Sequence, residues 1–186
     1  MWFDEAQQVI AFLKEKDYRN VNIIGTSGGA LVAINLALEA PQLLLKVVAD
    51  SFEGEIPLKE FTVNVVADRE LSKHDENMKM FYQYMQGEDW EKVVDNDTLA
   101  IVRHEKKIGK FFHKDLSVFK PDILMTGSKQ DEFVSSISPT YFEKIYGEML
   151  LKIGHGTMHS FETGGHPAMM KNQDEFILIS KNFFAQ

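Results

Sequence analysis

The chain has 186 residues, of which 44% are hydrophobic and 26% are charged, and its formal net charge is −8. This length suits one globular domain with a sizeable core, and both percentages are typical of such domains. The negative charge argues against a nucleic-acid or anionic-membrane partner, because both bind clusters of Lys and Arg. The absence of cysteine excludes disulfides, thiolate catalysis and cysteine-ligated metals.

Neither a secretory signal nor a membrane span is predicted. The first twenty residues have no basic segment followed by an apolar one. The longest apolar run, residues 30–40, contains Asn35 and Glu39 and is shorter than the roughly 20 residues that cross a bilayer. We therefore expect a cytoplasmic location, which also suits a chain without cysteine.

The first fifty residues alternate between patterns typical of helices and of strands. Apolar residues at helical spacing predict an amphipathic helix over residues 3–16, and the β-rich run 21–24 predicts a short strand. Residues 30–40 predict a second helix that ends before Pro41, and residues 43–49 predict a strand covered on both faces. This alternation implies a parallel sheet with helices packed on its faces.

Between residues 52 and 118 the chain is richer in charge and follows a helical period. We interpret this segment as a helical cap inserted into a single domain of residues 1–186, whose core comprises residues 1–51 and 119–186. Its large apolar side chains either pack the cap onto the core or shape an acyl pocket. They are Phe81, Tyr82, Tyr84, Met85, Trp90, Phe111 and Phe112.

The alternation of strands and helices resumes after residue 119. Residues 122–127 and 158–161 predict two further strands, and residues 173–184 predict a final amphipathic helix. Between the two strands, Ser138 and Pro139 predict the N-cap and the first position of another helix. The sequence thus predicts an α/β fold, with a parallel sheet, flanking helices and a helical cap insertion.

The run Gly25-Thr26-Ser27-Gly28-Gly29 lies between a predicted strand and a predicted helix. In this context a G-x-S-x-G run places the serine on a tight turn, with its side chain projecting from the sheet edge. We expect strained backbone angles at Ser27 and a collision across the turn if Gly25 or Gly29 carried a side chain. Ser27 is the predicted nucleophile, and the Gly28 amide is a predicted donor to an oxyanion. The alternative is a glycine-rich turn whose serine caps the helix.

A serine hydroxyl needs a base to take its proton and a third group to orient that base. Asp131 follows the predicted strand 122–127, and His166 follows the predicted strand 158–161. Because the carboxyl ends of parallel strands meet at one sheet edge, we expect both residues to lie near Ser27.

Other residues compete for both roles. Glu132 adjoins Asp131, and Asp50 follows the strand 43–49, so either could be the acid. His155 and His159 compete as the base, although His155 precedes the last strand and His159 lies within it. These two histidines do not form an H-E-x-x-H pattern, and no metal site is predicted.

Three motifs in order resemble the α/β-hydrolase superfamily, most closely its esterase and lipase branch: G-T-S-G-G, G-S-K-Q-D-E, and G-G-H-P before a terminal helix. The resemblance covers the chain from residue 21 to its end. It implies that Ser27 is the nucleophile, Asp131 the acid and His166 the base of a hydrolase of small-molecule carboxylic esters, without a metal or organic cofactor. The alternatives are a thioesterase, amidase or acyltransferase, or a non-catalytic interaction module.

The resemblance also implies several strands before the nucleophile, one of which leads to a loop with a second oxyanion donor. Residues 1–16 already resemble the helix that precedes the nucleophile strand. We therefore expect the N-terminal part of the fold to be missing and the strand 21–24 to form an exposed edge. This edge would pair with a second copy of the chain, as a homodimer, or with a missing N-terminal segment. Activity of this chain alone would be weak.

Overall fold

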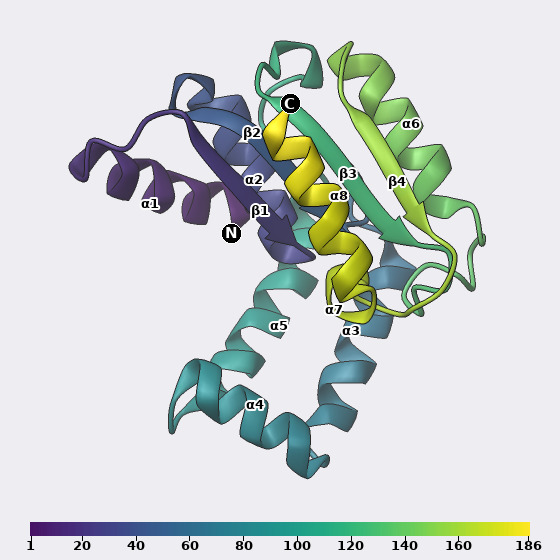
Figure 1. Cartoon of the computed structure of the whole chain (residues 1–186). Coiled ribbons are helices and arrows are strands. Elements are labelled where there is room, and N and C mark those ends of the chain that lie inside the picture. The colour runs from purple at the N-terminus through teal and green to yellow at the C-terminus, as the bar shows by residue number, and fades with distance from the viewer. The chain divides into compact units, whose positions relative to one another are not determined.

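The computed structural model describes all 186 residues and contains one parallel sheet in the order β1-β2-β3-β4 (Figure 1). Its strands, all of which overlap predicted ones, are β1 (Val21–Thr26), β2 (Leu44–Asp50), β3 (Asp122–Ser128) and β4 (Thr157–Phe161). The chain forms two compact units, one of Pro57–Lys110 with Met1, the other of Trp2–Ile56 with Phe111–Gln186. The larger unit holds the whole sheet.

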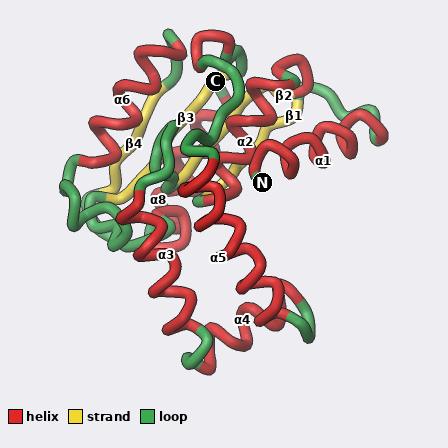
Figure 2. Tube along the Cα trace, turned by 180° about the vertical axis from the view of Figure 1, so that it is seen from behind, coloured by secondary structure: helices red, strands yellow, loops and turns green.

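Helices cover both faces of the sheet in the larger unit. On one face, α2 (Gly28–Glu39) packs against β1 and β2, and α6 (Tyr141–Ile153) packs against β3 and β4. α1 (Trp2–Glu15) packs against α2. The opposite face carries α7 (Ala168–Lys171) and α8 (Gln173–Ala185), as the views from the two sides show (Figures 1 and 2). The predicted α/β architecture is therefore confirmed.

The core lies on both sides of the central strands. Val47, Val48 and Ala49 of β2 are fully buried, which accounts for the run of three apolar residues that follows Lys46 in this strand. On the face of α7 and α8, Val48 packs in one cluster with Leu124, Phe161, Ala168 and Phe176. The two C-terminal helices are thus held to the sheet by apolar contacts.

The register of the strands brings their carboxyl ends to one edge of the sheet. Thr26 of β1 pairs with Asp50 of β2, which pairs with Thr126 of β3. Ser128 at the end of β3 pairs with Phe161 at the end of β4. The loops that follow these strands therefore emerge next to one another, as the sequence predicts for the residues of the candidate site.

β1 is an edge strand, because it ends the strand order. Its apolar Ile24 is 45% exposed. The predicted edge is confirmed, whereas its pairing with a second copy or another segment stays a prediction.

The smaller unit is helical and lies within the segment predicted as a cap. Asp75 caps one helix by accepting a 2.9 Å hydrogen bond from the Met78 amide, and Tyr82 stacks on Trp90 with 5.6 Å between ring centroids. The helices of this unit are α3 (Lys59–Ser72), α4 (Glu76–Gln86) and α5 (Trp90–Lys107). No helix of the chain is both long and apolar enough to cross a membrane.

Phe111 and Phe112 belong to the larger unit, although the sequence grouped them with the cap. Phe111 packs edge-on against Trp2, with 4.9 Å between ring centroids, and its carbonyl accepts a 3.1 Å hydrogen bond from the Asn35 side chain. Both phenylalanines are buried. Their side chains therefore contribute to the core beside α1 and α2.

The start of α6 differs from the prediction. The helix begins at Tyr141 with Thr140 as its N-cap, and not at Pro139. The hydroxyl and the carbonyl of Ser138 accept hydrogen bonds from the amides of Thr140 and Tyr141, each 3.2 Å long. The prediction was wrong because a Ser-Pro pair also begins turns, and here it forms a turn that precedes the helix.

Candidate active site

Ser27 lies on a tight turn between β1 and α2, in a backbone conformation that is rare for a residue other than glycine. Its φ is 52° and its ψ is −124°, and its amide donates a 2.8 Å hydrogen bond to the Asp50 carbonyl. A Cβ atom at Gly25 would overlap the main chain of Gly29, so Gly25 has to be glycine. A Cβ atom at Gly29 would meet no atom within 4 Å. The expected collision at Gly29 was wrong, because only its main chain faces the turn.

The Ser27 side chain does not cap α2. It makes no capping hydrogen bond, although Ser27 occupies the N-cap position. Its hydroxyl oxygen lies instead 2.9 Å from Nε2 of His166. The alternative of a glycine-rich turn with a capping serine therefore does not describe this turn.

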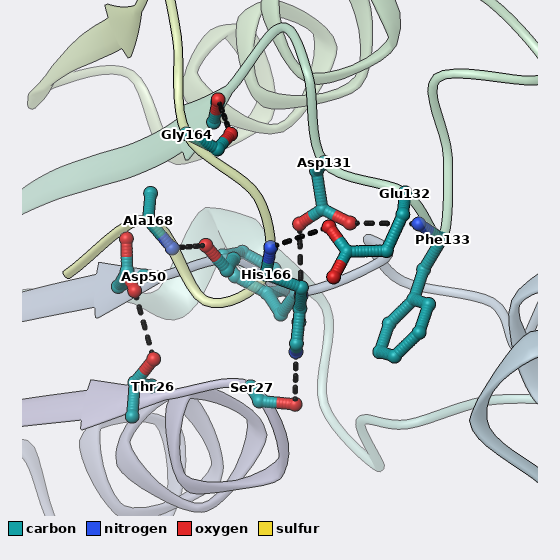
Figure 3. A network of polar contacts seen from close by, with 12 residues as sticks. Thr26, Ser27, Asp50, Asp131, Glu132, Phe133, Gly164, His166 and Ala168 are labelled. Carbon is teal, nitrogen blue, oxygen red and sulfur yellow. Dashed lines mark hydrogen bonds and ion pairs between the residues drawn. The ribbon is translucent and has the colours of Figure 1, made fainter. Parts of the chain in front are cut away.

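The structure brings Ser27, His166 and Asp131 together in one hydrogen-bonded series (Figure 3). His166 Nδ1 lies 2.8 Å from Asp131 Oδ2, and the side chains of His166 and Asp131 are 8% and 0% exposed. An ionised carboxylate only accepts hydrogen bonds, so Nδ1 carries the hydrogen and Nε2 accepts from the Ser27 hydroxyl. The three residues follow β1, β4 and β3, respectively, at the same sheet edge.

The loop after β3 contacts His166 through three consecutive residues. Asp131 is bonded to the imidazole, whereas Glu132 Oε2 accepts a 2.7 Å hydrogen bond from the His166 amide. The Phe133 ring lies against the imidazole, with 4.5 Å between ring centroids. The Phe133 amide donates a 3.0 Å hydrogen bond to the second oxygen of Asp131. Of the two adjacent carboxylates, Asp131 is thus the one that reaches the ring.

Asp50 is fully buried behind these residues, and its carboxylate accepts three hydrogen bonds. They come from the hydroxyl of Thr126 at 2.6 Å, the hydroxyl of Thr26 at 2.8 Å and the amide of Met169 at 3.1 Å. Burial raises the pKa of Asp50 above its usual value of 3.8, and this effect outweighs the lowering effect of these hydrogen bonds. Asp50 thus joins β1, β3 and the segment after His166.

Ser51 adds to this connection from the next position. Its φ is 54°, and its hydroxyl accepts a 2.8 Å hydrogen bond from the Ala168 amide. Its own amide donates to the Thr126 carbonyl at 2.8 Å. Sequence reasoning missed Ser51, Thr26 and Thr126. The sequence pattern that could have indicated this network is a polar residue at or near the carboxyl end of each of the first three strands, which are parallel.

The competing histidines lie elsewhere. His155 Nε2 is 3.3 Å from the Phe119 carbonyl, and His159 Nε2 is 3.1 Å from Glu175 on α8. No three His, Asp or Glu side chains of the chain are grouped so that they could hold a metal ion. Of these three histidines, His166 is the one within hydrogen-bond distance of Ser27.

Gly28, the predicted oxyanion donor, is the first residue of α2. The amides of a first helical turn have no partner within the helix, so the Gly28 amide sits where donation to a ligand is possible. A Cβ atom at Gly28 would lie 3.0 Å from the indole nitrogen of Trp2. Trp2 therefore packs closely beside the turn.

Comparisons with known proteins find similar structures but no similar sequence. No protein-family model and no curated protein matches the chain. A variant of a meta-cleavage product hydrolase from Pseudomonas fluorescens IP01 matches with a TM-score of 0.73 and 15% identity, over 98% of this chain and 71% of that one. A serine hydrolase from Cycloclasticus zankles matches with a TM-score of 0.64 and 20% identity, over 97% and 69%.

A lipase-esterase related protein from Clostridium acetobutylicum ATCC 824 has a TM-score of 0.64 and 16% identity, over 98% of this chain and 75% of that one. An alpha/beta fold family hydrolase from Bacillus anthracis is a further match. The TM-scores, from 0.62 to 0.73, show that these proteins share the fold of this chain, and at identities of 15–20% the likeness shows the fold alone.

Proposed function

We propose that this chain, which has the α/β-hydrolase fold, is a serine hydrolase that cleaves a carboxylic ester through an acyl-enzyme on Ser27. The observation that carries the proposal is the series of two hydrogen bonds from Ser27 Oγ to His166 Nε2, at 2.9 Å, and from His166 Nδ1 to Asp131, at 2.8 Å. The structurally similar proteins are hydrolases, which supports this class of enzyme.

In the proposed acylation, Ser27 Oγ attacks the ester carbonyl carbon while its proton passes to His166 Nε2. The carbonyl oxygen becomes an oxyanion, to which the Gly28 amide donates. The carbon–oxygen bond to the alcohol part then breaks, and the leaving oxygen takes the proton from Nε2. Asp131 holds the imidazole in the required tautomer and stabilises its positive charge in both steps.

In the proposed deacylation, a water molecule attacks the acyl carbon and gives its proton to His166 Nε2. A second oxyanion forms in the same place. When it collapses, the bond between the acyl carbon and Ser27 Oγ breaks, Ser27 recovers its proton from Nε2, and the carboxylic acid leaves. Every step uses a group of the chain, the substrate or water, so the proposal requires no metal or organic cofactor.

Other acyl substrates and a non-catalytic function are the competing proposals. The same residues could act on a thioester or an amide, or transfer the acyl group to another acceptor. The ester is preferred because the three motifs around Ser27, Asp131 and His166 resemble the esterase and lipase branch. A non-catalytic module is disfavoured by the engagement of the Ser27 hydroxyl with His166.

A fluorophosphonate probe and a series of p-nitrophenyl esters with increasing acyl length test the proposal. We expect the wild type to be labelled and to hydrolyse at least one ester. Both activities should disappear in Ser27→Ala and persist in Ser117→Ala, which alters an exposed serine outside the site. Labelling that persists in Ser27→Ala would show that the probe reacts with a residue other than Ser27. A folded wild type that neither labels nor turns over would favour the non-catalytic module.

A further inference from the structure

Glu132 is an exposed residue, yet its carboxylate makes a specific contact within the candidate site. Oε2 of Glu132 accepts the hydrogen bond from the His166 main-chain amide at 2.7 Å. A charged acceptor makes such a bond stronger than a bond between neutral groups. The adjacent Asp131 meanwhile accepts from the imidazole of the same histidine. Two neighbouring carboxylates thus hold one histidine at two different points.

The neighbouring glycine shows how closely the Glu132 carboxylate approaches this loop. A Cβ atom at Gly165 would overlap Oε2 of Glu132 and would lie 3.1 Å from its Cδ atom. A residue with a side chain at position 165 would therefore displace the carboxylate. The pair Gly165-His166 leaves room for Glu132 to reach the His166 amide.

Other bonds hold the loop before and after His166. The Thr163 carbonyl accepts 3.0 Å hydrogen bonds from the hydroxyl of Ser128 and the side-chain amide of Asn172. The Ala168 amide donates to Ser51. At His166, the main chain is held by Glu132.

We infer that Glu132 is a positioning residue for His166: it fixes the main chain of the base so that the imidazole bridges Asp131 and Ser27. A ring bonded through Nδ1 alone could still move with its own backbone, which would lengthen the distance from Nε2 to Ser27 Oγ. Proton transfer requires that distance to stay within hydrogen-bond reach. This inference rests on the proposed function, because it assigns Glu132 a part in orienting the proposed base.

Two substitutions at Glu132 distinguish the effect of its hydrogen-bond acceptor from the effect of its charge. Glu132→Gln keeps a carbonyl oxygen that can accept from the His166 amide, whereas Glu132→Ala removes the acceptor. We expect kcat to fall about tenfold in Glu132→Ala with KM within about twofold, and to stay within about twofold of wild type in Glu132→Gln. Glu162→Ala is the matched control. Glu162 is an exposed glutamate in the loop that carries His166, and its carboxylate pairs with Lys129.

The second measurement needs no turnover. We expect hydrogen exchange of the His166 amide, followed by NMR, to be about tenfold faster in Glu132→Ala than in the wild type or in Glu132→Gln. Equal exchange rates in all three proteins would overturn the inference, as would an equal loss of kcat in both variants or none in Glu132→Ala. An inactive wild type with the expected exchange pattern would refute the proposed hydrolase and leave the contact of Glu132 established.

Discussion

The contacts that stabilise the loops around His166 differ in kind from those within the helical unit Pro57–Lys110. Around His166, the carboxylates of Asp50 and Asp131 are buried, and each accepts more than one hydrogen bond. In the helical unit, charged pairs such as Arg69 with Asp97 remain partly exposed, and α4 has no buried residue. Buried polar networks depend on every member, whereas exposed ion pairs contribute little individually. Substitutions in the two regions should therefore differ greatly in effect.

Asp131→Asn tests the first region most severely. Asparagine can present its amide group to Nδ1 and favour the wrong imidazole tautomer, so we expect kcat for ester hydrolysis to fall about 10⁴-fold while the fold is retained. Steady-state kinetics and circular dichroism measure the two quantities. Asp122→Asn, an exposed aspartate at the start of β3, should change neither. A loss below about tenfold in Asp131→Asn would remove Asp131 from the proposed role.

A pair of glycine substitutions tests the turn that carries Ser27. Gly25→Ala places a Cβ atom against the main chain of Gly29, and we expect it to lower the free energy of unfolding by about 3 kcal/mol or more. Gly29→Ala meets open space within α2 and should raise that free energy by about 0.5–1 kcal/mol. Urea unfolding compares them. Equal effects of the two substitutions would contradict the geometry described for this turn.

The pH dependence of stability tests the buried carboxyl of Asp50. Because burial raises its folded-state pKa above 3.8, its contribution to stability is complete below the unfolded-state pKa. That contribution is lost as the pH rises through the folded-state pKa. The free energy of unfolding of Asp50→Asn minus that of wild type should therefore increase as the pH rises above about 4, which means that the variant gains stability relative to wild type.

Urea unfolding of wild type and Asp50→Asn at several pH values measures this difference, with Asp122→Asn as the exposed control. A difference that is constant with pH would show that the folded-state pKa of Asp50 is not raised.

Arg69→Ala, in the helical unit, should have the smallest effect. It removes a 2.7 Å ion pair with Asp97 and a 3.0 Å hydrogen bond to Thr98, both at partly exposed positions. We expect the free energy of unfolding to fall by at most about 1 kcal/mol and ester hydrolysis to stay within about twofold. A loss comparable with that of Asp131→Asn would break the contrast between the two regions.

Much of the fold could be predicted because the sheet follows from a simple pattern. Apolar strands alternate with helices, and parallel strands bring their carboxyl ends to one edge. That rule alone was enough to expect Ser27, Asp131 and His166 near one another. The exact partners of each carboxylate depend on register and loop conformation, which the sequence pattern does not contain. Asp50 and Glu132 were therefore considered only as alternative acids.

The remaining differences have local causes. The requirement for glycine is steric at Gly25 and absent at Gly29, because the two residues present different groups to the turn. Phe111 and Phe112 follow the helical segment after Gly109, whose φ is 69°. A glycine marks the end of a helix but does not tell which unit the next residues join. The contacts of Phe111 with Trp2 of α1 and Asn35 of α2 are long-range in sequence, and local patterns do not report such contacts.

The hydrogen bond from the Ser27 amide to the Asp50 carbonyl continues the ladder between β1 and β2 one residue beyond the end of β1. It fixes the backbone of Ser27 in its positive-φ conformation as an extension of the sheet. The conformational cost of this turn is consequently met during folding and does not recur each time a ligand arrives. A serine held in this way is preorganised for the proposed reaction, with its hydroxyl directed at His166.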